Sequence, residues 1–202
     1  RQGHARRGGG HPRQVQRLMR ELALNILDIA ENSLSAGAKL VEIEVCADFA
    51  ADRMSISIRD DGKGMSKEML ATVCDPFTTT RTTRKVGMGL PLFKYSAESA
   101  GGNFSIESEE GKGTSVRAEY QIGHVDRMPL GDFGGVALQL VTMNPNTDFV
   151  ISAKSGEGEG VLDTRQMREI LGEDIPFGAP EVRAFLKEYI KENLTDIFGG
   201  RL

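Results

Sequence analysis

The stretch from Met54 to Lys94 constrains the fold of this chain most strongly. Residues 54–59 alternate between apolar and polar side chains, as in a strand with one buried face. This strand stops at Asp60 in an Asp-Asp-Gly turn. A basic segment with several glycines follows, and it leads to a helix that we expect to open at Pro91.

The turn at the end of this strand can recognise a flat, polar ring. Asp60 ends the alternating pattern, so its carboxylate is expected at the mouth of the sheet, where it can accept a hydrogen bond from an exocyclic amine. Gly62 and Gly64 have no Cβ, which lets a ring approach the backbone closely. A DDGKG sequence on its own is more often a hairpin turn.

The second part of the stretch is suited to phosphate. Gly87 and Gly89 come just before Pro91, so the backbone N–H groups at the start of the helix are expected to be open to an anion. Three cationic side chains are expected to reach the same anion: Arg81, Arg84 and Lys85. A GMGL sequence alone is mostly a loop before a helix, but the order of the two parts favours a nucleotide site.

A long helix is predicted from about Gln14 to Ser35. It is apolar around most of its circumference, which indicates deep burial. One polar seam runs along it at steps of three and four residues: Asn25, Asp28, Asn32 and Ser35. Buried polar groups need partners. A nucleotide with Mg²⁺ would supply them, and so would neighbouring backbone or water.

Four sequence boxes in this order resemble the GHKL nucleotide-binding superfamily of gyrase, MutL and histidine kinases. AENSLSAGAK resembles the N box, DDGKGM and GMGL the two glycine boxes, and EEGKGTSV the last box, while DPFTTTR is similar to the phenylalanine box that opens the ATP lid. The resemblance covers roughly Glu21 to Ile122. It implies an α+β fold of the Bergerat type, a two-layer sandwich with a mostly antiparallel sheet and helices on one face.

The resemblance also implies roles for individual residues. Asn32 would coordinate a Mg²⁺ ion that bridges the phosphates of ATP. Asp28 would be the catalytic carboxylate, at a position where MutL-like and anti-sigma-factor kinases have a glutamate, and its shorter side chain leaves hydrolysis open. The ATP contacts implied are Asn32, Asp60, Gly62, Gly64, Met65, Phe77, Arg81, Arg84, Lys85, Gly87, Met88, Gly89, Leu90 and Thr114. Without the resemblance, Thr114 is explained as well by the start of a strand as by a contact to ATP. The five threonines of the lid, residues 77–86, are likewise explained as well by a solvated loop as by a role in the site.

The chain is expected to divide into three parts. Residues 1–18 form a flexible basic extension, either an upstream extension or remnant, or a mobile basic arm for a nucleic acid or an acidic partner. Residues 19–123 form the ATP-binding domain. Residues 124–202 form a small C-terminal α/β appendage, with a strand at 148–154, a hairpin turn at SGEGEG, a short helix that Thr164 caps and Gly172 ends, and a last helix from Pro180. Its apolar stripe is expected to pack on its own sheet, on the ATP-binding domain or on a partner.

Composition narrows the surroundings in which the protein is expected to act. The formal net charge of −4 gives no general reason to expect nucleic-acid binding. No apolar run approaches the roughly 18 residues of a membrane span, so a cytoplasmic protein is expected. Cys46 and Cys74 lie far apart, without the spacing of a metal site or a disulfide framework.

Three functions are compatible with these features. The first is a histidine-kinase-like regulatory kinase that phosphorylates a separate protein. The residues ahead of the domain are too few for a helical hairpin with an acceptor histidine, so the acceptor is expected on another protein. The histidines present are His4, His11 and His124. The second is an ATPase switch that closes a homodimer, and the third is an ATP-binding regulatory module without catalysis.

Overall fold

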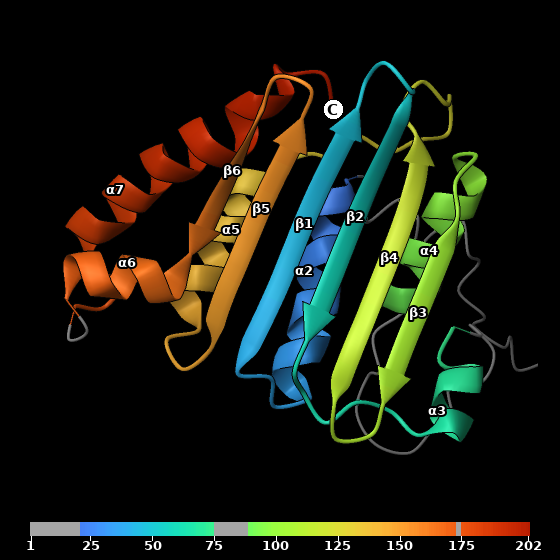
Figure 1. Ribbon diagram of the computed structural model, residues 1–202, viewed down its shortest axis with the longest axis horizontal. Coiled ribbons are helices and arrows are strands. Elements are labelled where there is room, and N and C mark those ends of the chain that lie inside the picture. Colours follow the sequence, from blue (N-terminus) through green and yellow to red (C-terminus); the bar gives the residue numbers. More distant parts are fainter. Residues whose placement is uncertain (1–20, 75–88, 173–174) are drawn as a thin grey trace, which may run out of the picture.

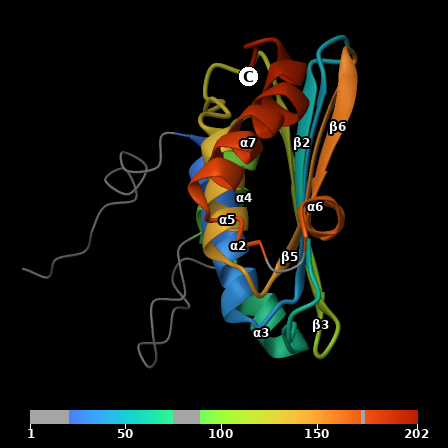
Figure 2. The ribbon, with the colours of Figure 1, turned by 90° about the vertical axis from the view of Figure 1, so that its left-hand side faces the viewer.

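The computed structural model describes residues 21–74, 89–172 and 175–202. A six-stranded sheet with the order β3-β4-β2-β1-β5-β6 runs through the molecule (Figure 1). Helices α2, α4, α5 and α7 form a second layer on one face of this sheet (Figure 2). The prediction of a two-layer α+β sandwich with helices on one face is therefore confirmed.

The helix that carries the polar seam is α2 (Leu22–Ser35). It begins at Leu22 because Glu21 has an extended backbone, and residues 14–20 of the predicted helix lie outside the described residues. Its buried face presents Leu22, Ile26 and Ile29 to the sheet. It ends at Ser35, two residues before Gly37, whose φ of +79° is the left-handed conformation that commonly follows the end of a helix.

The strands that follow α2 are antiparallel to one another. They are β1 (Leu40–Asp48), β2 (Arg53–Asp60), β3 (Phe104–Glu109) and β4 (Gly113–Gln121), with the short helix α3 (Lys67–Thr72) and the helix α4 (Gly89–Ser99) between β2 and β3. The described part of α4 starts two residues before the predicted Pro91. The register aligns Asp60 with Thr114 and Ser108 with Thr114. This alignment brings three polar residues from three strands to one end of the sheet.

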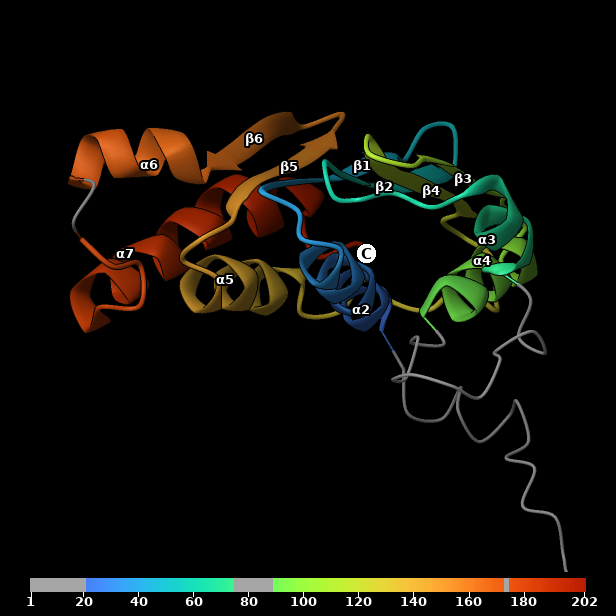
Figure 3. The ribbon, with the colours of Figure 1, turned by 90° about the horizontal axis from the view of Figure 1, so that it is seen from below.

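The C-terminal part of the chain continues the same sheet. Helix α5 (Phe133–Met143) leads to β5 (Asp148–Ser155), which pairs in parallel with β1, and β6 (Gly158–Asp163) pairs antiparallel with β5. Figure 3 shows α5 between α2 and α7, and α5 packs against both. The apolar side chains of both parts form one core. The division of the chain at residue 123 stays a prediction.

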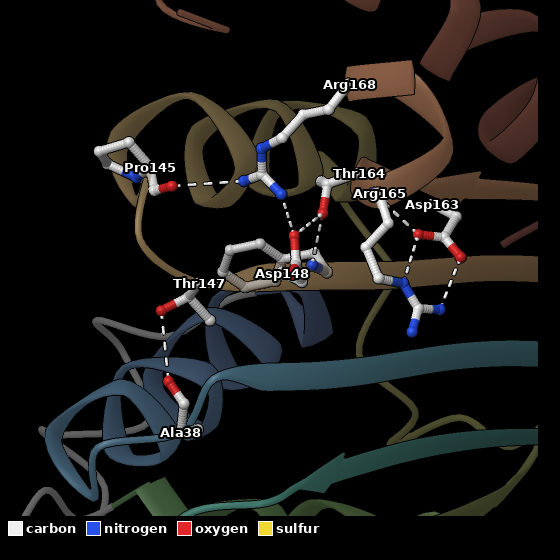
Figure 4. Close-up of polar contacts among 9 residues, drawn as sticks. Ala38, Pro145, Thr147, Asp148, Asp163, Thr164, Arg165 and Arg168 are labelled. Atoms are coloured by element: carbon white, nitrogen blue, oxygen red, sulfur yellow. Dashed lines mark hydrogen bonds and ion pairs between the residues drawn. The ribbon is translucent and has the colours of Figure 1, made fainter. Parts of the chain in front are cut away.

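Helix α6 (Thr164–Leu171) lies beside the end of β6 and is fixed by polar contacts (Figure 4). The prediction that Thr164 caps it is wrong, because the Asp163 carboxylate accepts the N–H of Arg165 there, at 2.9 Å. Thr164 is fully buried instead: its hydroxyl accepts the N–H of Phe149 at 2.9 Å and donates to Asp148 at 3.0 Å. Asp148 also forms an ion pair with Arg168.

The last helix is less regular than its sequence predicts. Helix α7 (Pro180–Ile190) is followed by a π-helical turn, η1 (Lys191–Thr195), and a short 3₁₀ turn, η2 (Asp196–Phe198). The buried residues recur every four positions: Leu186, Ile190, Leu194 and Phe198. The wider π turn keeps this stripe on the sheet. Phe185, which is next to Leu186 in α7 but lies off the stripe, is 47% exposed.

Across the described ranges, every helix is too short or too polar to cross a bilayer.

Candidate functional site

The Asp60 carboxylate is held in place by its own neighbours. Asp60 is 9% exposed at the end of β2. Its Oδ2 atom accepts a hydrogen bond from the Ser33 hydroxyl at 2.6 Å, and its Oδ1 atom accepts the N–H of Gly62 at 2.9 Å. Charge-assisted bonds of this kind are short and strong. They fix the carboxylate while each oxygen keeps a further lone pair for an incoming donor.

Ser33 was not among the predicted site residues. It lies off the polar seam of α2 and is 3% exposed, and its hydroxyl lies 3.3 Å from the Ile29 carbonyl as well as against Asp60. Its position directly after Asn32, at the C-terminal end of the helix, is the only sequence signal that points to it.

Thr114 lies next to Asp60 through the pairing of β2 with β4. Its hydroxyl lies 2.9 Å from the hydroxyl of Ser108, which also accepts the N–H of Met65 at 2.9 Å and donates to the Gly113 carbonyl at 2.9 Å. Ser108, which sequence reasoning missed, thereby connects the loop after Asp60 to the β3–β4 hairpin. The register of that hairpin is the signal that would have revealed it.

The loop at residues 61–65 is clamped between α2 and the β3–β4 hairpin. The N–H of Lys63 donates to the Ala36 carbonyl at 3.0 Å, and the Lys63 carbonyl accepts the N–H of Gly111 at 2.8 Å. Gly64 has a φ of +64°, and a Cβ built on it would lie 2.0 Å from the Glu109 carbonyl oxygen. Only glycine fits such a close approach. The loop that follows Asp60 is thus a packed part of the fold.

Asp28 lies against the beginning of α4. A Cβ built on Gly89 would lie 1.9 Å from the Asp28 Oδ2 atom, so the carboxylate occupies the space that a side chain would need. This Oδ2 atom is buried and has no hydrogen-bond partner among the described residues. Burial raises the pKa of Asp28 above its ordinary value of 3.8. An unpaired, desolvated carboxylate of this kind is a strong proton or cation acceptor.

Asn32 lies one helical turn after Asp28 and on the same face of α2. Its side chain is partly exposed, and no hydrogen bond to it is found within the described residues. One turn before Asp28, the Asn25 side chain is buried and both of its amide atoms lack partners there. Glu31, by contrast, is exposed and points away from this seam. Along this seam, Asn25, Asp28 and Asn32 therefore have side-chain polar atoms without a hydrogen-bond partner among the described residues.

The predicted site is only partly placed by the structure. Nine predicted site residues lie within the described ranges: Asp28, Asn32, Asp60, Gly62, Gly64, Met65, Gly89, Leu90 and Thr114. The contacts above connect Asp60, Gly62, Met65 and Thr114 at one end of the sheet, and they place Asp28 against Gly89. Six predicted ATP contacts, all in the lid or the second glycine box, lie outside the described residues: Phe77, Arg81, Arg84, Lys85, Gly87 and Met88.

Comparison with known proteins gives relatives for the first part of the chain. The sensor histidine kinase AruS of Pseudomonas aeruginosa is 31% identical over 119 residues, which cover 56% of this chain and 12% of that protein. The non-motile and phage-resistance protein of Caulobacter vibrioides is 32% identical over 123 residues, which cover 58% of this chain and 15% of that protein. The chain therefore spans only a small part of the length of these relatives.

A solved structure with a similar fold extends over more of the chain. The N-terminal domain of a DNA repair protein aligns with a TM-score of 0.52 at 14% identity, and the alignment covers 81% of this chain and 59% of that one. At this identity the likeness concerns the fold alone. The family model of the histidine kinase-, DNA gyrase B- and HSP90-like ATPases matches residues 10–123, more than half of the chain. The chain belongs to this family of histidine kinase-, DNA gyrase B- and HSP90-like ATPases.

Proposed function

We propose that the protein binds ATP with Mg²⁺ and transfers the terminal phosphate to a separate protein as a histidine-kinase-like regulatory kinase. The observation that carries the proposal is the seam of α2, where the buried Asp28 Oδ2 atom has no partner among the described residues and the Asn32 side chain is free beside it. Unpaired buried polar groups cost about 1 to 3 kcal/mol each. A seam of this kind is stabilised when a ligand supplies the missing partners.

The residues present fit such a ligand. The Asp60 carboxylate, pre-aligned by Ser33 and Gly62, has the geometry to accept the exocyclic amine of adenine, with Thr114 beside it. Mg²⁺ usually takes one or two protein ligands and completes its shell with phosphate and water. Asn32 could be such a protein ligand. Within the described ranges, no cluster of three acidic, histidine or cysteine side chains could hold a metal by itself. A bound Mg²⁺ would neutralise the charge of the phosphates.

Asp28 is proposed to orient the phosphate acceptor and to take up its proton. The raised pKa of its carboxyl brings it closer to neutral pH, which favours proton uptake. Because phosphoryl transfer depends mostly on positioning and charge neutralisation, the protein needs no nucleophile of its own. The likeness to sensor histidine kinases in the matched half of the chain supports a role in signalling to a partner protein.

The same observation favours a second function. A carboxylate without a partner can orient a water molecule as well as an acceptor side chain, and hydrolysis would then make the protein an ATPase switch in which nucleotide closes a homodimer. The two functions differ in where the terminal phosphate ends. Phosphate on a partner protein identifies the kinase, and free phosphate identifies the switch.

The test is incubation with γ-labelled ATP and Mg²⁺, alone and with a cell extract, followed by measurement of free phosphate and of protein-bound label. Asp28→Asn is compared with Glu31→Gln, which changes an exposed carboxylate on the same helix. The kinase predicts label on an extract protein that Asp28→Asn abolishes and Glu31→Gln preserves. Free phosphate that depends on Asp28 would replace the kinase by the switch, and tight ATP binding without either product would contradict both.

A further inference from the structure

The Ser108 hydroxyl, near the end of β3, has three hydrogen-bonding contacts at one end of the sheet. It accepts the N–H of Met65 at 2.9 Å, lies 2.9 Å from the Gly113 carbonyl oxygen, and lies 2.9 Å from the Thr114 hydroxyl. Met65 belongs to the loop that follows Asp60, and Thr114 is the residue opposite Asp60 in the pairing of β2 with β4. One hydroxyl therefore contacts both segments that lie next to the Asp60 carboxylate.

These three contacts determine which hydroxyl donates to which. A serine hydroxyl carries one proton and two lone pairs. The Met65 N–H uses one lone pair of Ser108, and the Ser108 proton is directed to the Gly113 carbonyl, which can only accept. For the 2.9 Å contact between the two hydroxyls to be a hydrogen bond as well, Thr114 has to donate its proton to the second lone pair of Ser108. Thr114 then keeps lone pairs but no free proton.

Asp60 and Thr114 thereby present the same polarity to a ligand. Residues directly opposite in an antiparallel pair have their side chains on the same face of the sheet, and the bond between Asp60 and Ser33 shows that this is the face that α2 covers. The Asp60 carboxylate, which already receives the Ser33 hydroxyl and the Gly62 N–H, can only accept further hydrogen bonds. This end of the sheet therefore offers acceptors, which suit an amino group and repel a carbonyl oxygen.

We propose that Ser108 is a positioning residue that determines which purine base the site accepts. Because Ser108 takes the Thr114 proton, Asp60 and Thr114 form an acceptor pair. This pair selects a purine with an amino group at position 6, as in adenine, and rejects a purine with a carbonyl there, as in hypoxanthine. Ser108 acts through Thr114 and not by contact with the base. The inference rests on the proposed binding of ATP and adds the residue that sets its base selectivity.

The test compares the dissociation constants of ATP and inosine triphosphate, which has a carbonyl at position 6 and a proton on N1. Both are measured by calorimetry with Mg²⁺ for the native protein, Ser108→Ala, Thr114→Val and the double variant. In Ser108→Ala the Thr114 proton is free to donate to the carbonyl. We therefore expect the preference for ATP to fall about three- to tenfold, as for one hydrogen bond. With Thr114→Val there is no proton to free, so adding Ser108→Ala should leave the preference as it is in the single Thr114→Val variant.

Two further variants separate this role from a purely structural one. Ser108→Thr keeps the hydroxyl and is expected to retain the native preference. Ser105→Ala removes an exposed hydroxyl from the same strand and is expected to change neither affinity.

Two results would overturn the inference and leave ATP binding intact. One is a Ser108→Ala variant that weakens both nucleotides by the same factor, which would make Ser108 a structural residue only. The other is a change of preference on Ser108→Ala that persists in the Thr114→Val background. Native protein that binds neither nucleotide would instead contradict the proposed function, and the inference with it.

Discussion

The two ends of α2 treat their polar groups in opposite ways. At its C-terminal end, Ser33 and the loop after β2 satisfy both oxygens of Asp60. At its N-terminal end and middle, Asn25 and Asp28 keep buried polar atoms that find no partner among the described residues. Asp60 and Asn25 are both buried, so burial alone does not decide which polar groups find partners.

This contrast assigns ligand recognition to the Asp60 end of α2 and the proposed reaction to the Asp28 end. A carboxylate that is fixed before a ligand arrives costs little reorganisation on binding, which favours selectivity. A seam with missing partners costs stability in the free protein and is stabilised only when something fills it. We therefore expect changes at the Asp60 end to reduce stability strongly, and changes at the Asp28 end to leave stability unchanged or raise it.

The largest effect on stability is expected for Gly64→Ala. The new Cβ would collide with the Glu109 carbonyl oxygen, and the residue would also have to keep a φ of +64°. Overpacking and left-handed strain together are expected to lower the free energy of unfolding by about 3 to 5 kcal/mol in urea denaturation. Gly111→Ala is the control, because Gly111 has a φ of +80° but open space around it. It is expected to cost about 1 to 2 kcal/mol, and equal losses in the two variants would mean that the loop after Asp60 is not clamped.

Ser33→Ala tests the hydrogen bond to Asp60 itself. The variant leaves a buried carboxylate oxygen without its 2.6 Å donor, and loss of a bond to a charged group costs about 1.5 to 3 kcal/mol. Ser35→Ala removes an exposed hydroxyl from the same helix and is expected to change stability by about 0.5 kcal/mol or less. Thermal or urea unfolding of both variants decides the matter. Similar losses of stability in the two variants would mean that the hydrogen bond from Ser33 does not stabilise Asp60.

The smallest effect has the opposite sign and depends on pH. The folded-state pKa of Asp28 is raised by burial, so the native state binds more protons than the unfolded state between the two pKa values. Stability therefore falls as pH rises from about 3.8 through the folded pKa. Asp28→Asn removes this loss and is expected to stabilise the protein by about 1 kcal/mol or less at neutral pH, since solvent still reaches part of the side chain. The gain should vanish below both pKa values.

Asp52 provides the matched control for this pH dependence. The hydrogen bonds from the Gln121 side chain and the Gly123 N–H lower the pKa of Asp52. Its contribution to stability is present above the unfolded pKa and is lost as pH falls through the folded pKa. Asp52→Asn is therefore expected to destabilise the protein at neutral pH. The same sign for Asp28→Asn and Asp52→Asn in a series of unfolding curves across pH would contradict the contrast.

Most of the fold followed from local sequence signals. The alternation at residues 54–59 predicted the strand that ends at Asp60. The EEGKG turn sets the register that places Thr114 beside Ser108, whereas Thr114 reaches Asp60 through the pairing of β2 with β4, two strands that no hairpin joins. The parallel pairing of β5 with β1 carries no local signal, because it joins residues about a hundred positions apart. The π turn that follows α7 likewise carries no signal in the apolar pattern of the last helix.

The candidate site was predictable in its carboxylates and glycines but not in the hydroxyls that support them. Asp60 was predicted from its position at the end of a strand, and Asp28 and Asn32 were predicted from their spacing along the helix. Ser33 became visible only when tertiary packing set its partner, whereas Ser108 follows from the register of the β3–β4 hairpin. The polar seam was predictable as a pattern, whereas which of its members find partners depends on the packing of α4 against α2.

The most direct test of the account is the affinity for ATP, measured by calorimetry with Mg²⁺ and with a chelator, for the native protein and for Asn32→Ala. Circular dichroism confirms that the variant is folded. The account predicts that Mg²⁺ strengthens ATP binding to the native protein and that Asn32→Ala removes this strengthening, a loss of at least about tenfold. Equal affinity of the two proteins in the presence of Mg²⁺ would contradict the assignment of the α2 seam as the nucleotide site.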